Sequence, residues 1–165
     1  MKIFVIACTV LAALLAGSGA TAEEGGATLG AGDLAIHDAA RIGRGADVER
    51  LLKANPAARD ARTPAGSTPL HLAATNPDLS ALKVLIAAGA DPNARDNEGA
   101  TPLHMAAYTQ NARHAQLLLE AGADPMAKTN AGRDPTSMAR KAMAHEAAGV
   151  ISLWILKGCK AGKPC

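Results

Sequence analysis

Five histidines are the residues of this sequence whose side chains could bind a metal or transfer protons. A neutral imidazole ligates zinc, and it titrates near neutral pH. Three of the histidines share one position of a repeated pattern, and two lie later in that pattern: His37, His71 and His104, then His114 and His145. Nothing near the last two suggests further ligands. We therefore expect them to be solvated surface histidines, and we predict no metal site.

No catalytic constellation accompanies these histidines. The sequence has no G-x-S-x-G elbow, no H-E-x-x-H zinc motif and no phosphate-binding glycine–lysine loop. Asp91 and Asp124 could act as paired carboxylates, but each closes one copy of the repeat, so their spacing follows from its period. We predict a protein that is not an enzyme and that needs no cofactor.

The histidines lie in a sequence that repeats. Residues 66–98 align without a gap with residues 99–131, which is a period of 33 residues. Both copies begin with G-x-T-P-L-H-x-A-A, and both contain A-G-A-D-P towards the end. A fixed period of this size is typical of stacked repeats, in which each unit buries its apolar side against its neighbours.

The two motifs closely resemble the ankyrin repeat. The resemblance covers residues 34–158 and implies an all-α solenoid of about four helix–turn–helix repeats with β-hairpin-like finger loops, bounded near 34–65, 66–98, 99–131 and 132–158. It also implies that the histidine of T-P-L-H is structural and bonds to the backbone of the neighbouring loop. Histidines one repeat apart are separated by about 10 Å, which is too far to share a metal whose ligands lie about 2 Å away.

Each copy carries signals that begin and end its helices. Thr68 and Thr101 stand where an N-cap hydroxyl would accept a backbone N–H, and a proline follows where its missing N–H costs nothing. Gly89 and Gly122 are expected to end the second helices, because glycine adopts the left-handed conformation without strain. Paired alanines leave room for close packing, which suits a sequence with only 2% aromatic residues.

The N-terminus has the parts of a secretory signal peptide. Lys2 precedes an apolar run over residues 3–16, and an A-x-A site ends at Ala22. We predict a signal peptide over residues 1–22, a flexible leader over 23–33 and export to the periplasm or beyond. The alternative is a membrane anchor, but the run is shorter than the ~20 apolar residues of a span.

The three cysteines fall at the two ends of the chain. Cys8 faintly resembles a lipoprotein site, but it lies too early to leave an apolar region before it. Cys159 and Cys165 bound the C-terminal tail, and an even count at short spacing in an exported protein suggests a disulfide. So short a loop gains at most about 2 kcal/mol, so the bond would only pin the tail. The alternative is two free thiols or a weak metal pair.

Recognition is expected at positions that the repeat itself does not need. The net charge is +2 without a run of like charges, so we do not expect nucleic acid as a partner. The resemblance places a groove along the finger tips and first helices, and the residues that map there are Arg41, Thr75, Asn76, Asn97, Glu98, Tyr108, Thr109, Asn130, Arg133 and Lys141. Tyr108 is the only tyrosine, a residue enriched among interface anchors. The alternative is a tyrosine half-packed on a neighbouring finger.

The sequence predicts an exported, monomeric module that binds a partner protein of unknown identity, with no membrane span in the mature chain. Two alternatives stay open. An enzyme, or a carrier of a small ligand or metal, could use the groove or the region of His114 and His145. A homo-oligomeric structural protein could associate through the last helix, expected over about 145–157, where Trp154 lies among apolar residues.

Overall fold

The computed structural model describes residues 32–162, and this part of the chain is all-helical, without a strand. The predicted signal peptide, most of the leader and Cys165 lie outside the described residues. No helix within residues 32–162 is long and apolar enough to cross a bilayer. In chain order the elements are α1 (Ala35–Ile42), α2 (Gly45–Ala54), the 3-10 helix η1 (Pro56–Asp60), α3 (Pro69–Ala73), α4 (Leu79–Ala87), α5 (Pro102–Tyr108), α6 (Ala112–Glu120), α7 (Pro135–Lys141) and α8 (His145–Leu156).

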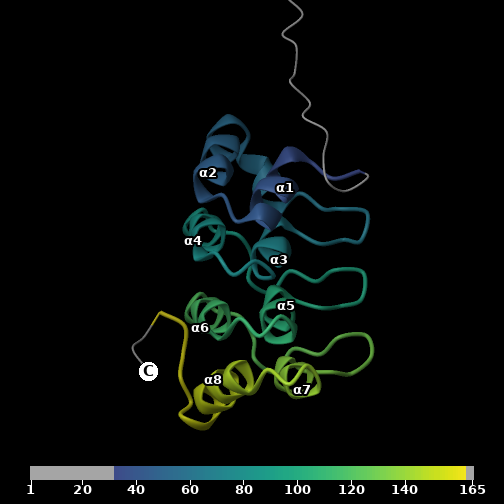
Figure 1. Cartoon of the computed structure of the whole chain (residues 1–165), viewed down its shortest axis with the longest axis vertical. Coiled ribbons are helices and arrows are strands. Elements are labelled where there is room, and N and C mark those ends of the chain that lie inside the picture. The colour runs from purple at the N-terminus through teal and green to yellow at the C-terminus, as the bar shows by residue number, and fades with distance from the viewer. Residues whose placement is uncertain (1–31, 163–165) are drawn as a thin grey trace, which may run out of the picture.

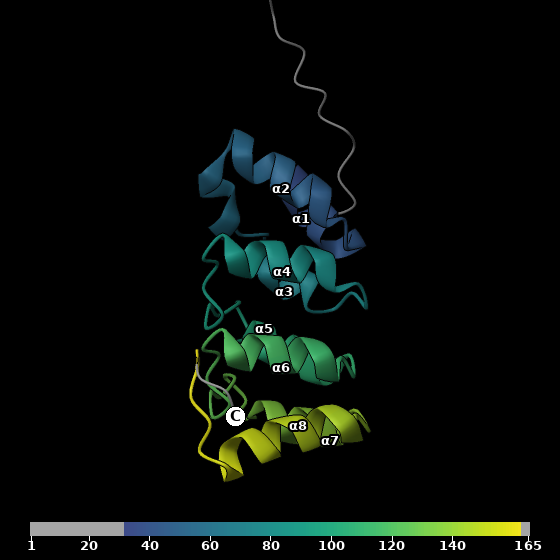
Figure 2. The same cartoon turned by 90° about the vertical axis from the view of Figure 1, so that its left-hand side faces the viewer.

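The helices stack in two parallel columns. Helices α1, α3, α5 and α7 form an inner column beside three projecting finger loops, and α2, α4, α6 and α8 form an outer column (Figure 1). After a quarter turn the outer column faces the viewer and covers the inner one (Figure 2). Each helix packs on its partner within the pair and on its counterpart in the next pair. The expected helical solenoid is confirmed.

Small side chains set the spacing of the two columns. Alanine supplies 17 of the 27 buried apolar residues in the described part of the chain, so the helix backbones can approach closely. Leucines at equivalent positions fill the space between successive pairs, among them Leu70, Leu85, Leu103 and Leu118, all fully buried. The core is therefore thin and continuous along the stack, as expected when each repeat buries its apolar side against the next.

A histidine caps the start of the inner helices. Nδ1 of His71 accepts the backbone N–H of Thr68 at 3.1 Å, and His104 accepts that of Thr101 at the same distance. The two threonine hydroxyls lie 2.9 Å from the same Nδ1 atoms, so each threonine and its histidine form a capping box at the start of the helix.

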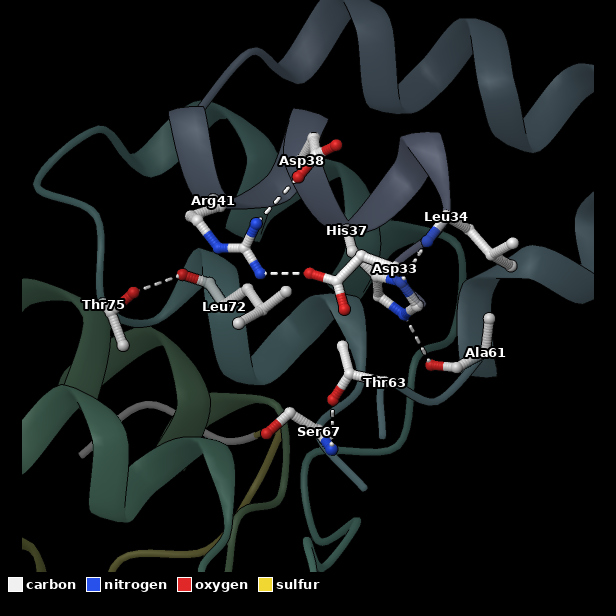
Figure 3. Close-up of polar contacts among 10 residues, drawn as sticks. All are labelled: Asp33, Leu34, His37, Asp38, Arg41, Ala61, Thr63, Ser67, Leu72 and Thr75. Carbon is white, nitrogen blue, oxygen red and sulfur yellow. Dashed lines mark hydrogen bonds and ion pairs between the residues drawn. The ribbon is translucent and has the colours of Figure 1, made fainter. Parts of the chain in front are cut away.

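The other ring nitrogen ties α1, α3 and α5 to the segment that leads into the next inner helix. Nε2 donates to a backbone carbonyl at 3.1 Å in all three cases: His37 to Ala61, His71 to Ala100, and His104 to Arg133. Figure 3 shows the first of these, with Nδ1 of the same ring accepting the N–H of Leu34. A carbonyl oxygen can only accept, so Nε2 carries the proton and Nδ1 is the acceptor. The structural role expected for these histidines is confirmed.

Each finger loop is a tight turn closed by backbone hydrogen bonds. In the first finger the N–H of Thr63 donates to the carbonyl of Ser67 at 3.0 Å, and the N–H of Gly66 donates to that of Thr63 at 2.8 Å. The second and third fingers repeat this pair of bonds one period later. The fingers are hairpin-like in this sense only, since no strand forms in the described residues.

Glycine is required at two of the finger turns. Gly66 has a φ of +77°, and a Cβ there would lie 2.4 Å from Oδ1 of Asn97 in the next finger. Gly99 has a φ of +74°, and its Cβ would lie 2.5 Å from Oδ1 of Asn130. A side chain would therefore strain the backbone and also collide with the amide of the following finger.

The last helix pair departs from the pattern at two buried positions. Asp134 caps α7 by accepting the N–H of Ser137 at 2.8 Å, as expected of an N-cap, but Ser137 now stands where the earlier repeats have histidine. Thr136 stands where they have Leu70 and Leu103. Thr136 is 8% exposed, and its hydroxyl has no hydrogen-bond partner among the described residues. Burial removes this hydroxyl from water, and no hydrogen bond among the described residues offsets the free-energy cost of that desolvation.

Replacing Thr136 by valine should stabilise the protein. Valine keeps the branched shape and removes the unpaired hydroxyl, so the free energy of unfolding in urea should rise by up to about 1 kcal/mol. Thr101→Val is the matched control, because it removes a hydroxyl that is bonded to His104, and it should lower the same free energy by about 1 kcal/mol. A loss of stability in Thr136→Val would contradict this account of the site.

Stability should fall as the pH drops through the range in which histidine titrates. Burial lowers the pKa of His71 and His104, although the hydrogen bond that each ring donates to a backbone carbonyl partly opposes this effect. Below about pH 6.5 the unfolded chain takes up protons that the folded state resists, so folding becomes less favourable. Urea unfolding measured between about pH 7.5 and about pH 5.5 should show a steady decrease in unfolding free energy. An unfolding free energy that stays constant over the same pH range would show that the buried rings are not held in the neutral form.

Candidate binding face

The inner helices meet the finger loops on one surface of the molecule, here called the inner face. This face carries the residues that the sequence predicts to take part in recognition. At or just after the C-terminal ends of the inner helices, equivalent positions carry four different side chains, which are Arg41, Thr75, Tyr108 and Lys141. The inner helices stack one above another (Figure 1), so equivalent positions on successive helices follow one another along the stack. The four side chains have different surroundings, so their polar groups differ in how far they are available to a partner.

The guanidinium of Arg41 is already paired within the chain. Its Nη1 lies 2.7 Å from Oδ1 of Asp38, and its Nη2 contacts Oδ2 of Asp33. Both carboxylates are largely shielded, with side chains 14% and 5% exposed. Figure 3 shows the arginine held between the two acids. This end of the inner face therefore presents a neutralised cation.

The two threonines of the nominated set cap the ends of inner helices. The hydroxyl of Thr75 donates to the carbonyl of Leu72 at 2.7 Å, and that of Thr109 donates to the carbonyl of Met105 at 2.8 Å. Thr109 is also approached by Nδ2 of Asn111 at 3.1 Å. Their polar atoms are used inside the protein, which leaves mainly the methyl groups for contacts with a partner.

The three nominated asparagines join neighbouring repeats. Their Nδ2 atoms donate to backbone carbonyls one repeat earlier: Asn76 to Arg41 at 2.8 Å, Asn97 to Pro64 at 3.0 Å, and Asn130 to Asn97 at 3.0 Å. Asn97 and Asn130 stay exposed at the finger tips, and Glu98 is exposed beside them. The amides hold the loops in register, and a role for these residues in partner binding stays a prediction.

Tyr108, Arg133 and Lys141 are brought together at one place. They line an open hollow of about 530 Å³ between the end of α5, the third finger and α7, and the ring of Tyr108 is 61% exposed. Arg133 and Lys141 are exposed as well. Three nominated residues from three elements thus border one surface depression, which offers an aromatic ring, a guanidinium and an ammonium group to a partner.

Three further residues of the hollow were not foreseen. Gln110, Met138 and Ala142 complete its lining. The Nε2 of Gln110 donates to the carbonyl of Ala142 at 3.2 Å, which fastens the loop after α5 to the end of α7. Met138 precedes Lys141 by one helical turn and therefore shares its side of α7. The three-residue spacing of Met138 and Lys141 was the sequence signal that could have placed Met138 in the lining. No sequence pattern indicated the contact between Gln110 and Ala142.

His114 contradicts the expectation of a solvated surface histidine. It is 2% exposed and occupies the position of the buried residues Ala81 and Ala147 in the neighbouring repeats. Burial lowers its pKa, an effect that its hydrogen bond to the backbone of Asp78 partly opposes. Its Nε2 has no partner among residues 32–162, while His145 is exposed as expected. The described residues contain no group of three or more metal-ligating side chains.

A comparison with protein families gives the fold its name. A family model described as ankyrin repeats, in three copies, matches residues 36–129. The chain belongs to the ankyrin repeat family. No curated protein matches the chain significantly. The matched range runs from α1 to the third finger loop, so α7 and α8 lie beyond it.

The family places limits on what the inner face does. Ankyrin repeats generally mediate protein–protein interactions, and the family is typically non-catalytic. Four of the six residues that line the Tyr108 hollow, Arg133, Met138, Lys141 and Ala142, lie beyond the matched ankyrin range. The most distinctive part of the inner face is thus formed where the last helix pair meets the regular repeats.

Asn76→Ala should weaken the fold of this ankyrin stack. The side chain donates to the carbonyl of Arg41 at 2.8 Å and accepts the N–H of Asp78 at 2.7 Å, and its loss leaves the partly buried carbonyl of Arg41 without this partner. We expect the free energy of unfolding in urea to fall by about 1–3 kcal/mol. Gln116→Ala is the control, since that amide bonds only to exposed side chains, and it should change the free energy by less than about 0.5 kcal/mol. Equal effects of the two substitutions would contradict the proposed linking role.

Proposed function

We propose that this protein is a non-catalytic module that binds a partner protein through its inner face, with the Tyr108 hollow as the main contact. The observation that carries the proposal is the convergence of Tyr108, Arg133 and Lys141 on one open depression. Tyrosine and arginine are the side chains most enriched among residues that dominate binding energy. The tyrosine ring is 61% exposed, so it offers a large apolar area to a partner at a small cost in rotamer entropy.

The shape of the inner face supports binding of a protein surface. The hollow at Tyr108 is open to solvent along the stack, whereas catalytic and small-ligand sites usually enclose most of the bound molecule. The exposed finger tips at Asn97, Glu98 and Asn130 extend the same face beyond the hollow. A partner that contacts both regions would bury the area that specific protein interfaces require.

The chemistry of the histidines supports the absence of catalysis. Both nitrogens of His71 and His104 are committed to bonds within the chain, so neither ring has a lone pair or a mobile proton to offer a substrate. His114 is buried, away from the surface where a substrate would bind. The inner face therefore acts through contacts and charge.

We further propose that the module works as a monomer outside the cytoplasm. The support is the pattern of charge, apolar run and A-x-A site in residues 1–22, which lie outside the described part of the structure. Export would also favour the disulfide between Cys159 and Cys165, the second of which lies outside the described residues as well. The tail before it folds back on the stack, where the N–H of Gly162 donates to the carbonyl of Glu120 at 3.2 Å.

Affinity capture from the native cell envelope tests this proposal. The mature protein should retain a specific partner, and Tyr108→Ala should weaken that binding by about tenfold or more, as expected for the loss of an aromatic anchor. Because Tyr108 is exposed, the melting temperature of the variant should stay within about 3 °C of the original.

Arg50→Ala provides the matched control. Arg50 lies on α2 in the outer column, and its side chain is 74% exposed, so the substitution should leave capture unchanged. Equal recovery of the partner by the Tyr108→Ala variant, or loss of it by Arg50→Ala, would refute a contact centred on the hollow.

A further inference from the structure

We infer that the segment of the partner that enters the Tyr108 hollow is acidic, with carboxylates on either side of an apolar side chain. This inference rests on the proposed function, and it specifies the chemistry of the partner at that site. It follows from three features of the described residues: the lining of the hollow, the pairing of cations along the inner face and the distribution of charge along the stack.

The lining combines apolar surface with positive charge. Tyr108, Met138 and Ala142 offer an aromatic ring, a thioether and a methyl group, and Arg133 and Lys141 add two cations. Within residues 32–162, no aspartate or glutamate lines the hollow. An apolar side chain of the partner can therefore rest on the tyrosine and the methionine while neighbouring carboxylates reach the two cations.

These two cations are not neutralised within the described structure. Among residues 32–162 no carboxylate oxygen lies within 4.0 Å of the charged nitrogens of Arg133 or Lys141. The acid next to Arg133 in the sequence, Asp134, uses its carboxylate to cap α7. By contrast Arg41, at the position equivalent to Lys141 in the first repeat, is held by two acids. The unpaired cations can therefore form their ion pairs with a partner.

Positive charge is concentrated in the C-terminal part of the described stack, where the hollow lies. Residues 126–162 contain six lysines and arginines and two acidic residues, which is a net charge of +4. Residues 32–125 contain nine lysines and arginines and eleven acidic residues, which is a net charge of −2. Complementary potentials raise association rates and fix the orientation of a partner, so an acidic segment is drawn to the α7 end of the inner face.

A peptide segment fits this site better than a nucleic acid does. Only two cations converge on the hollow, whereas nucleic-acid binding rests on many phosphate contacts along a clustered basic surface. The remaining lining is apolar and has the composition of a protein-binding pocket, in which a single anchored side chain supplies most of the energy.

Peptide display tests the inference without knowledge of the natural partner. Random short peptides are selected on the immobilised full-length mature protein, with the Tyr108→Ala variant as a counter-selection. Selected sequences should be enriched in aspartate and glutamate around a leucine, phenylalanine or methionine. Enrichment without a charge bias, or enrichment of basic peptides, would overturn the inference, as would a selection that enriches no peptide.

Binding of the best selected peptide is then measured by fluorescence anisotropy at low salt. The double variant Arg133→Gln/Lys141→Gln should weaken binding roughly tenfold, because each exposed ion pair contributes up to about fivefold. Arg140→Gln is the matched control, since Arg140 is an exposed cation on the same helix that does not line the hollow, and its effect should be less than about twofold.

Equal losses in the double variant and in Arg140→Gln would overturn the inference, because they would indicate a diffuse charge effect. Tighter binding of a single-stranded oligonucleotide of the same net charge would also overturn it. Either result leaves the proposed function standing if Tyr108→Ala still abolishes capture of a partner from the cell envelope. Failure of that capture experiment would instead refute the proposed function itself.

Discussion

The structure depends on a neutral imidazole placed between two repeats. In His71 and His104 one ring nitrogen accepts the N–H that begins the helix, and the other donates to the backbone that leads into the next repeat. A single side chain thus starts its own helix and fixes the next one. This works only while the ring is neutral, because a protonated Nδ1 could no longer accept, and a buried N–H and a threonine hydroxyl would lose their partner. Burial, which lowers the pKa of both rings, therefore serves the same bond that the fold requires.

The bonds that hold the stack in register leave a distinct set of side chains for recognition. Asn76, Asn97 and Asn130 bind backbone carbonyls of the preceding repeat, so they set the spacing of the loops. The hollow at Tyr108 is built on that spacing, since its lining comes from α5, the third finger and α7. A surface that gathers residues from three elements stays in place only if the elements are locked to one another. Because this scaffold is rigid, less conformational entropy is lost when a partner binds.

The two ends of the inner face differ although they share one architecture. Arg41 and Lys141 occupy equivalent positions, but two acids surround the first and none surrounds the second in the described structure. The last helix pair also replaces the structural histidine by Ser137 and a core leucine by Thr136. The most individual chemistry of the protein is found there, beyond the range that matches the ankyrin family.

The sequence alone determined the period and the helix ends at Gly89 and Gly122. Through the family resemblance, it also indicated the role of the repeated histidines. These features depend on residues close in the chain or on a pattern that recurs. It also placed Tyr108, Arg133 and Lys141 on one face. It did not foresee that Gln110 and Met138 would join them, or that His114 would be buried. Those facts were decided by the tertiary structure. They depend on contacts between repeats, and a side chain's burial and partners are set by atoms about 33 residues away that no local pattern describes.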